Sequence, residues 1–374
     1  MLRVRRELEA KLALLKVAGV GPKRFEVLCS HFGSAQAVLA RSSRHLVEAG
    51  VPEKLSHAIS RASYEDARRA LTWCHANGIK IWCRSESHYP ERLRHIADPP
   101  ALLFGVGEAR LDERPCIAIV GARRASTHGV QFAKRLGADL ADAGFDVVSG
   151  LAYGIDAAAH EGALYANGST LAVMGTGIDC VYPSAHRKLS RAIRESGLLL
   201  SEYLPGTPPH ASHFPRRNRI VSGLSVAVVV VQAGARSGSL ITARLGLEQG
   251  RVVGAVPGMP GVSHHAGTNE LLRQGALLVR HADDILEEIA PQLERRASKQ
   301  SEAIFGQSVP DEHRPLAELL LENSCHTDEI ANYFNKPAEV VRAELTALEI
   351  SGFIRRSQDG LWTWLLRIGD PDTR

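Results

Sequence analysis

The sequence lacks the features that define several common classes of protein. Its six cysteines include no C-x-x-C pair, so we expect neither a zinc site nor a disulfide framework, and scattered thiols are typical of a reducing cytoplasm. No apolar run approaches the roughly 20 residues that a membrane-spanning helix needs. The charged start, Met1 to Glu7, has no apolar stretch behind it and does not resemble a secretory signal. We therefore expect a cytoplasmic protein without a metal and without a membrane partner.

A strong charge of one sign is also missing. The net charge of the 374 residues is only +4. This value permits nucleic-acid binding but does not demonstrate it, because an electrostatic footprint requires charges that cluster. A chain of this length is expected to form two or three domains. The local clusters of basic residues therefore carry more information than the total.

Apolar periodicity and turn residues divide the chain into segments. Residues 1–90 predict a helical domain, in which a Gly19-Val-Gly-Pro22 turn between helices resembles helix–hairpin–helix or SAM-like modules. Such a turn either donates backbone N–H groups to a DNA phosphate or only packs helices, and the sequence leaves both open. Residues 91–290 predict an α/β domain, residues 291–311 a polar linker, and residues 312–374 a small last domain.

The α/β domain is predicted from short apolar runs that alternate with helix-like sequence. This alternation is typical of βαβ units, so we expect an extended Rossmann-like domain whose parallel or mixed sheet is covered by helices on both faces. The run Leu102 to Phe104 is expected at the edge of the sheet. The main expected strands are residues 117–120, 147–149, 170–174, 198–201, 226–231, 252–256 and 276–279.

The last domain is predicted to be a winged helix. Thr327 is expected to cap one helix and Pro337 to be the first residue of the next. The expected elements are helices over Leu316–Leu321, Thr327–Phe334 and Pro337–Leu348, then a hairpin that turns at Asp359-Gly360. The last of these helices carries Glu339 and Glu344 beside Arg342, so a protein–protein or dimer-support role is favoured over entry into the major groove by a transcription regulator.

Three loops rich in small residues each follow an expected strand and lead into a helix. They begin at Gly121, Gly150 and Gly234. In an open parallel sheet such loops gather at the carboxyl edge, where glycines admit an anion to the backbone N–H groups and helix N-termini favour negative charge. The first loop is not G-x-G-x-x-G, and Ser149-Gly150 stands where the ribose-binding acid of a dinucleotide site is expected. We predict phosphate binding along this edge, without a nucleotide cofactor.

Arginines make these loops more specific. Arg123 and Arg124 add charged donors for phosphate, and the segment His213 to Arg219 combines three arginines with Asn218 and Phe214. Single-stranded nucleic acid requires this combination, since cations track the backbone while an aromatic ring stacks on a base. The alternative is an ion-pair network in which Glu202 is an available partner, with Phe214 in the core. The candidate phosphate- or DNA-binding residues are Gly121, Arg123, Arg124, Ser126, Gly150, Gly154, Lys188, Phe214, Arg216, Arg217, Asn218, Arg219, Ser237, Gly238 and Ser239.

Catalysis is not predicted. Asp156 and His160 share a helix face, but no third group joins them, so capping and packing are favoured over a metal or an acid–base pair. Tyr182 either stacks on a base or seals the sheet edge. A rival hypothesis is a phosphoribohydrolase in which Glu202 or Asp156 acts as acid or base. A second carboxylate beside the loops would be needed for it, and the sequence offers no convincing one.

Taken in order along the chain, these motifs resemble one family. They are Gly121-Ala-Arg-Arg-x-Ser126, Ser149-Gly-Leu-Ala-x-Gly-Ile-Asp156, Gly175-Thr-Gly177 with Tyr182-Pro183, Ser201-Glu202, Phe214-Pro-Arg-Arg-Asn-Arg219, Ser237-Gly-Ser-Leu-Ile-Thr-Ala243, Ala255-Val-Pro-Gly258 and Gly267-x-Asn269. The set is similar to the bacterial DNA-processing protein A family (DprA, also called Smf) in its three-domain form. The resemblance covers nearly the whole chain and is looser at Ser263 to Ala266.

The resemblance implies a function that the residues alone do not give. Members of the family bind single-stranded DNA on the Rossmann-like domain, self-associate, load the RecA recombinase onto DNA that enters during natural transformation, protect that DNA and help displace single-strand-binding protein. They are not known as enzymes. By this resemblance Arg123, Arg124, Phe214, Arg216, Arg217 and Arg219 fall where the family contacts DNA, and Ser237 to Ser239 lie on the same loop edge. We therefore expect a cytoplasmic, non-enzymatic homodimer.

Overall fold

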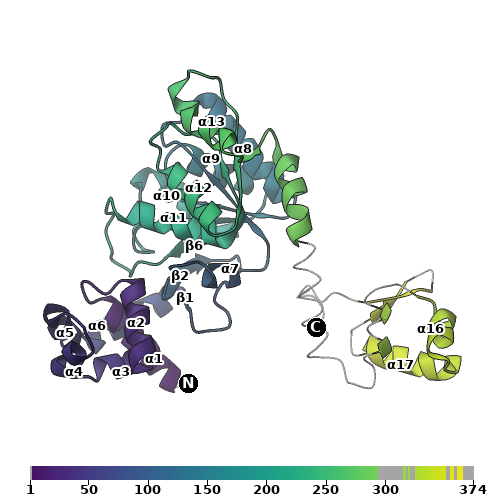
Figure 1. Cartoon of the computed structure of the whole chain (residues 1–374), viewed down its shortest axis with the longest axis horizontal. Helices are drawn as coiled ribbons and strands as arrows, with labels where there is room; N and C mark the ends of the chain where they lie inside the picture. Colours follow the sequence, from purple (N-terminus) through teal and green to yellow (C-terminus); the bar gives the residue numbers. More distant parts are fainter. Residues whose placement is uncertain are drawn as a thin grey trace. The chain divides into compact units, whose positions relative to one another are not determined.

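The computed structural model describes residues 2–293, 315–316, 319–320, 325–350, 354–357 and 360–364. The chain divides into two compact units, Met1–Ile289 and Ala290–Arg374 (Figure 1), and each is described by itself. Among the helices of these residues, none is both long and apolar enough to cross a membrane. The predicted linker, apart from residues 291–293, lies outside the described residues, as does half of the predicted helix Leu316–Leu321.

The first unit begins with six helices around their own core. Gly19, with a φ of 93°, lies in the turn that follows the first helix. Pro22 occupies the first turn of the second helix. Leu14, Phe25 and Leu46 are buried where these helices meet. The helices are α1 (Leu2–Leu15), α2 (Pro22–Phe32), α3 (Ala35–Leu39), α4 (Ser43–Glu48), α5 (Glu53–Ser60) and α6 (Tyr64–Ala76).

A nine-stranded sheet forms the rest of this unit. Its order is β1-β2-β6-β5-β4-β3-β7-β8-β9. β3 to β9 run parallel, whereas β2 pairs antiparallel with β6 and β1 pairs antiparallel with β2. The strands are β1 (Lys80–Cys83), β2 (Leu102–Gly107), β3 (Cys116–Val120), β4 (Asp146–Ser149), β5 (Thr170–Met174), β6 (Leu198–Ser201), β7 (Ser225–Val230), β8 (Val252–Ala255) and β9 (Leu277–Leu278). The predicted fold class, an extended Rossmann-like domain with a mixed sheet, is confirmed.

The edge of the sheet differs from the prediction. The run Leu102 to Phe104 is not an edge strand, because β2 pairs with β6 on one side and with β1 on the other. Its residues are buried, as an interior strand requires, and β1 supplies the edge. Leu12 and Ala67 of the helical part share a hydrophobic cluster with these strands. The boundary expected at residue 90 therefore falls inside one compact unit.

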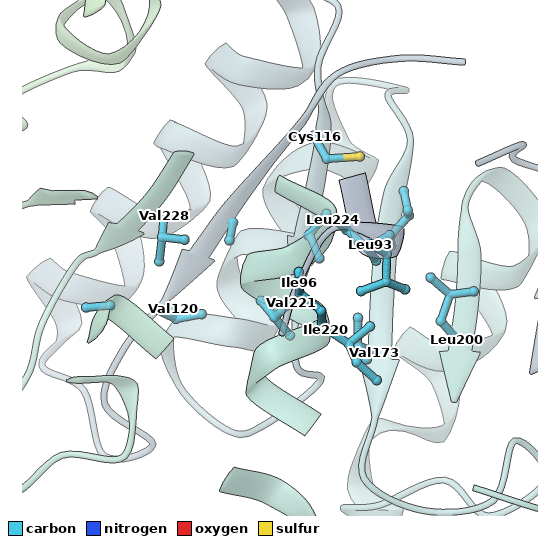
Figure 2. Packing of buried hydrophobic residues seen from close by; sticks show 14 of the residues in the cluster. Leu93, Ile96, Cys116, Val120, Val173, Leu200, Ile220, Val221, Leu224 and Val228 are labelled. Carbon is cyan, nitrogen blue, oxygen red and sulfur yellow. The ribbon is translucent and has the colours of Figure 1, made fainter. Parts of the chain in front are cut away.

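Helices cover both faces of the sheet. Figure 2 shows Ile220, Val221 and Leu224 of α11 packed among residues of the sheet that include Val173. α11 thus buries its carboxyl-terminal half in the core, and its amino-terminal half reaches the carboxyl edge of the strands. The helices are α7 (Glu91–Arg94), α8 (Thr127–Asp142), α9 (Ile155–Tyr165), α10 (Arg187–Ser196), α11 (His213–Leu224), α12 (Ser239–Glu248) and α13 (Ala266–Arg273).

The second unit has the helix and hairpin pattern of a winged helix, as predicted. Its elements are α16 (Thr327–Phe334), α17 (Ala338–Ile350), β10 (Ile354–Arg356) and β11 (Trp362–Trp364), and the two strands pair antiparallel. Thr327 is not the N-cap that the sequence predicted. His326 is the cap, and its N–H donates to Glu329 at 2.7 Å, while the hydroxyl of Thr327 accepts a hydrogen bond from Nε1 of Trp362. Pro337 likewise precedes the first residue of α17.

Candidate nucleic-acid interface

A cleft of about 650 Å³ lies where the strand order reverses, at the carboxyl ends of β3, β4 and β7. This is the position at which open α/β sheets bind ligands. All three loops predicted from the sequence contribute to its walls. The lining residues are Val120, Gly121, Arg123, Gly150, Ala152, Asp156, Tyr182, Pro209, His210, Ala211, Phe214, Pro215, Arg217, Asn218, Val221, Ser237, Gly238, Ser239, Ile241 and Thr242.

The loop after β3 presents its arginines to solvent. Arg123 and Arg124 are both exposed. Gly121 cannot carry a side chain without crowding, since a Cβ would lie 2.6 Å from Cγ1 of Ile155. Ser126 caps α8 by accepting a hydrogen bond from the N–H of Gly129 at 3.1 Å. The loop therefore offers Arg123 to the cleft, whereas the hydroxyl of Ser126 is used inside the fold.

The loop after β4 is packed against its neighbours. Gly154 has a φ of 74° and approaches the carbonyl of Ala122 so closely that a Cβ would overlap it. Asp156 is buried and accepts hydrogen bonds from the N–H groups of Gly150 and Ala152 at 3.1 and 3.4 Å. Burial raises the pKa of Asp156, although Arg217 opposes this shift. Asp156 thus caps the loop, which is the role that the sequence favoured.

His160 does not form an acid–base pair with Asp156. Its ring is fully buried, and Nδ1 lies 2.7 Å from the hydroxyl of Thr170. Burial lowers the pKa of His160 to about 3, with the nearby charge of Arg217 adding to the effect. A neutral, enclosed imidazole of this kind packs α9 against the sheet. Among the described residues no cluster of metal-binding side chains is found.

An aromatic and cationic stack forms one wall of the cleft. The guanidinium carbon of Arg123 lies 5.4 Å from the centre of the half-buried Phe214 ring. Tyr182 is 46% exposed, and its ring lies 5.5 Å from that of Phe214 at an angle of 36°. Gly175 leaves room for Phe214, since a Cβ there would lie 2.8 Å from the ring. This wall offers both a cation and aromatic faces to a ligand.

The arginines of α11 divide into exposed and buried groups. Arg216 is exposed and Asn218 partly so, whereas Arg217 and Arg219 are 3% and 6% exposed. Arg217 donates to the carbonyl of Val173 and occupies the space left by Gly150, where any side chain would overlap it. Burial lowers the pKa of Arg217 to about 10, against the opposing charge of Asp156. Its guanidinium therefore stays charged at the floor of the cleft.

Arg219 is held by carboxylates instead of facing the cleft. It binds Glu202 through two nitrogens, at 2.6 and 3.1 Å, and lies 3.4 Å from a carboxylate oxygen of Asp98. Burial alone would lower the pKa of Arg219, but Glu202 and then Asp98 outweigh it and raise the pKa above its usual value. Glu202 also lies 3.4 Å from Nε of Arg216. The ion-pair network that the sequence left as an alternative thus exists around Glu202.

The third loop leads into α12. Gly238 is the N-cap residue of α12 and, as a glycine, provides no side-chain cap. The N-terminus of α12 lies at the cleft. The hydroxyls of Ser237 and Ser239 lie 2.8 Å apart, and Ser239 is largely buried. Nδ2 of Asn218 donates to the carbonyl of Gly238 at 3.4 Å. This contact ties α11 to the third loop.

Not every predicted residue lies in the cleft. Lys188 is exposed in the first turn of α10 and does not line it, and neither do Arg124 and Arg216. Conversely, His210 lines the cleft although it was not predicted to, and its ring lies 5.3 Å from that of His213. The only signal for it was its position three residues before His213, where the His213 to Arg219 cluster begins. Its place depends on how the loop after β6 folds back.

Comparison with known proteins identifies related chains. A family model for DNA recombination-mediator protein A matches residues 80–290, and a model for the DprA winged helix domain matches residues 300–360. Protein Smf of Escherichia coli strain K12 is 37% identical over 289 residues, which cover 76% of this chain and 77% of that protein. The two family models together fall on both compact units.

Two solved structures resemble the fold. The X-ray structure of DNA processing protein A from Streptococcus pneumoniae matches with a TM-score of 0.67 and 33% identity, over 75% of this chain and 97% of that one. A structure of DNA processing protein A from Helicobacter pylori, described by its single-stranded DNA binding mode, matches with a TM-score of 0.52 and 31% identity, over 57% of this chain and 96% of that one.

Proposed function

The chain belongs to the DNA recombination-mediator protein A family, also called DprA or Smf, and we propose that it binds single-stranded DNA in the cleft beside α11. The observation that carries the proposal is the cluster of Arg123, Phe214 and Tyr182 on one wall of the cleft. The three loops that were predicted to bind phosphate line the same cleft. Cations for the backbone and rings for the bases are the two parts that single-strand binding requires.

We assign the candidate residues to two roles. Arg123, Arg124, Lys188, Arg216 and Asn218 are exposed or partly exposed and are proposed to contact phosphates. Arg217 and Arg219 are buried and hydrogen-bonded within the protein, so they are proposed to support the DNA-binding surface without touching the phosphates. The contacts to phosphates would position the DNA strand without reading its base sequence. The loop backbones of Gly121, Gly150, Ser237, Gly238 and Ser239 line the cleft and are proposed to complete the surface. Gly154 and the Ser126 cap of α8, which do not line the cleft, are proposed to hold these loops in shape.

In the cell we propose that this binding serves recombination in the cytoplasm. A chain of this family would protect single-stranded DNA that enters during natural transformation, help displace single-strand-binding protein and load RecA, and it would act as a homodimer. The matching chain from Helicobacter pylori is described as binding single-stranded DNA, which supports the first step. The later steps rest on the family alone.

We propose no catalytic step. Asp156 is the carboxylate among the residues that line the cleft, and it is already engaged by two backbone N–H groups. Glu202, the other candidate acid or base, is held by Arg219. A phosphoribohydrolase would need a carboxylate free to act on a ribose. Release of a free base from a nucleoside monophosphate by the purified protein would restore that alternative.

The first experiment is fluorescence anisotropy with a labelled single-stranded oligonucleotide and with the matched duplex, at low and at moderate salt. Tight binding of the single strand that weakens steeply with salt is expected, because bound phosphates release counterions. A preference for the duplex would instead point to the winged helix. Absence of binding to both would overturn the proposal.

A further inference from the structure

The Gly19–Pro22 turn, between α1 and α2, lies beside α11, the helix that lines the cleft. A side chain placed on Gly21 would lie 3.7 Å from Nη2 of Arg216. Arg216 belongs to the first turns of α11, between Phe214 and Asn218, which both line the cleft. The Gly19–Pro22 turn of the helical part therefore continues the surface on which the cleft opens.

Arg216 is a fixed cation between these two regions. Its Nε lies 3.4 Å from a carboxylate oxygen of Glu202, whereas Nη2 faces the turn. Glu202 is itself held by the buried Arg219, and the side chain of Arg216 remains 39% exposed. A partly exposed guanidinium that a carboxylate already orients loses little freedom when it binds a phosphate.

The turn itself offers further donors and positive charge. Lys23 and Arg24 are exposed, and Nη1 of Arg24 donates to the carbonyl of Gly19 at 2.6 Å, which holds the turn in shape. Within the described part of the chain, no hydrogen bond occupies the N–H groups of Lys23 and Arg24 in the first turn of α2. The nearby carboxylate of Glu26 is paired with Arg84. The surface around the turn is therefore net positive.

We propose that a bound single strand leaves the cleft across Arg216 and that its next phosphates bind where the Gly19–Pro22 turn enters α2, through the side chain of Lys23 and the N–H groups of Lys23 and Arg24. This inference rests on the proposed function and extends it to the helical part of the chain. Backbone N–H groups, lysines and helix N-termini are ordinary phosphate ligands that carry no sequence preference. The footprint on DNA is then longer than the cleft, and the helical part adds affinity only for strands that reach it.

The test compares two strand lengths and two charge reversals. Anisotropy is measured with oligothymidylates of about 6 and about 30 nucleotides, at several salt concentrations. Lys23→Glu is expected to weaken binding of the long strand several-fold and to lower its salt slope by about one, while the short strand binds as it does to the unchanged protein. Lys80→Glu makes the same change of charge at an exposed position on β1, and it is expected to leave both strands nearly unaffected.

Each other outcome has a definite meaning. Unchanged binding of the long strand by Lys23→Glu overturns the inference, and so does an equal loss for both strand lengths, which would put Lys23 in the cleft. An equal loss in Lys80→Glu would attribute the effect to overall charge and would also overturn it. If the unchanged protein binds neither strand, the proposed function itself fails. Thermal melting of both variants shows whether they fold, as is expected for exposed lysines.

Discussion

Arg219 and Glu202 form a buried, two-point ion pair that joins α11 to the end of β6. Nη2 and Nη1 of the arginine lie 2.6 and 3.1 Å from the two carboxylate oxygens, and both side chains are almost inaccessible. The same carboxylate lies beside the exposed Arg216. One acidic residue thus fixes a buried arginine and orients an exposed one. This arrangement makes the network around Glu202 a support for the proposed DNA surface.

Breaking that pair is expected to destabilise the protein. Arg219→Ala leaves Glu202 buried with only Arg216 to oppose its charge, so the free energy of unfolding should fall by about 3–5 kcal/mol. Replacing both members by apolar residues, Arg219→Met with Glu202→Leu, should recover much of the loss. Urea denaturation measures all three. Arg44→Ala, which removes an exposed pair with Glu48, is the control and should have a much smaller effect.

Arg123 is expected to contribute to DNA affinity and little to stability. Its side chain is exposed, so Arg123→Ala should leave the melting temperature nearly unchanged. The affinity for single-stranded DNA should fall for all sequences alike, and the salt slope should decrease by about one. Arg135→Ala, on the exposed side of α8, is the matched control. An unchanged affinity in Arg123→Ala would remove this residue from the site.

Phe214 tests the stacking part of the interface. Phe214→Leu keeps an apolar side chain but removes the aromatic ring. The free energy of binding to single-stranded DNA should become less favourable by about 1–3 kcal/mol, while the salt dependence of the affinity stays the same. The loss should be much smaller on a strand with abasic sites, because there is no base to stack. An equal loss on both strands would indicate that Phe214 only shapes the cleft.

A variant of Arg217 tests whether this residue contacts a DNA phosphate or only supports the shape of the cleft. Because its guanidinium is buried against Gly150 and near Asp156, Arg217→Ala should lower both the free energy of unfolding and the DNA affinity. If Arg217 makes no contact with a phosphate, the salt dependence of the DNA affinity should remain that of the unchanged protein. A decrease of the slope by about one would show instead that Arg217 reaches a phosphate directly.

Asp146 predicts a pH dependence of stability. Burial raises the pKa of this 2% exposed residue to about 6. The folded state therefore holds a proton more tightly than the unfolded state, and the free energy of unfolding should fall as the pH rises from about 4 to about 6, then level off. Asp146→Asn should remove this dependence and stabilise the protein at neutral pH by up to about 3 kcal/mol. Urea denaturation across that pH range measures both effects.

The sequence by itself determined the sheet and the position of the candidate site. Apolar runs such as Val226 to Val231 are long enough and β-branched enough to be strands, and parallel strands place the loops that follow them at one edge. The Arg-rich loop at Gly121 and the cluster His213 to Arg219 could therefore be assigned to one surface before any contact was known. These are local signals, since period, turn residues and charge are read within a few positions.

Tertiary structure decided which arginines face solvent. Arg216, Arg217 and Arg219 look alike in the sequence, yet only Arg216 is exposed. Arg219 is buried because Glu202 comes from the end of another strand, and Arg217 because Gly150, far away along the chain, leaves a space for it. The same holds for the Gly19–Pro22 turn, which reaches Arg216 only because the first helices pack on β1 and β2. Burial and charge pairing depend on such distant partners, and no local pattern encodes them.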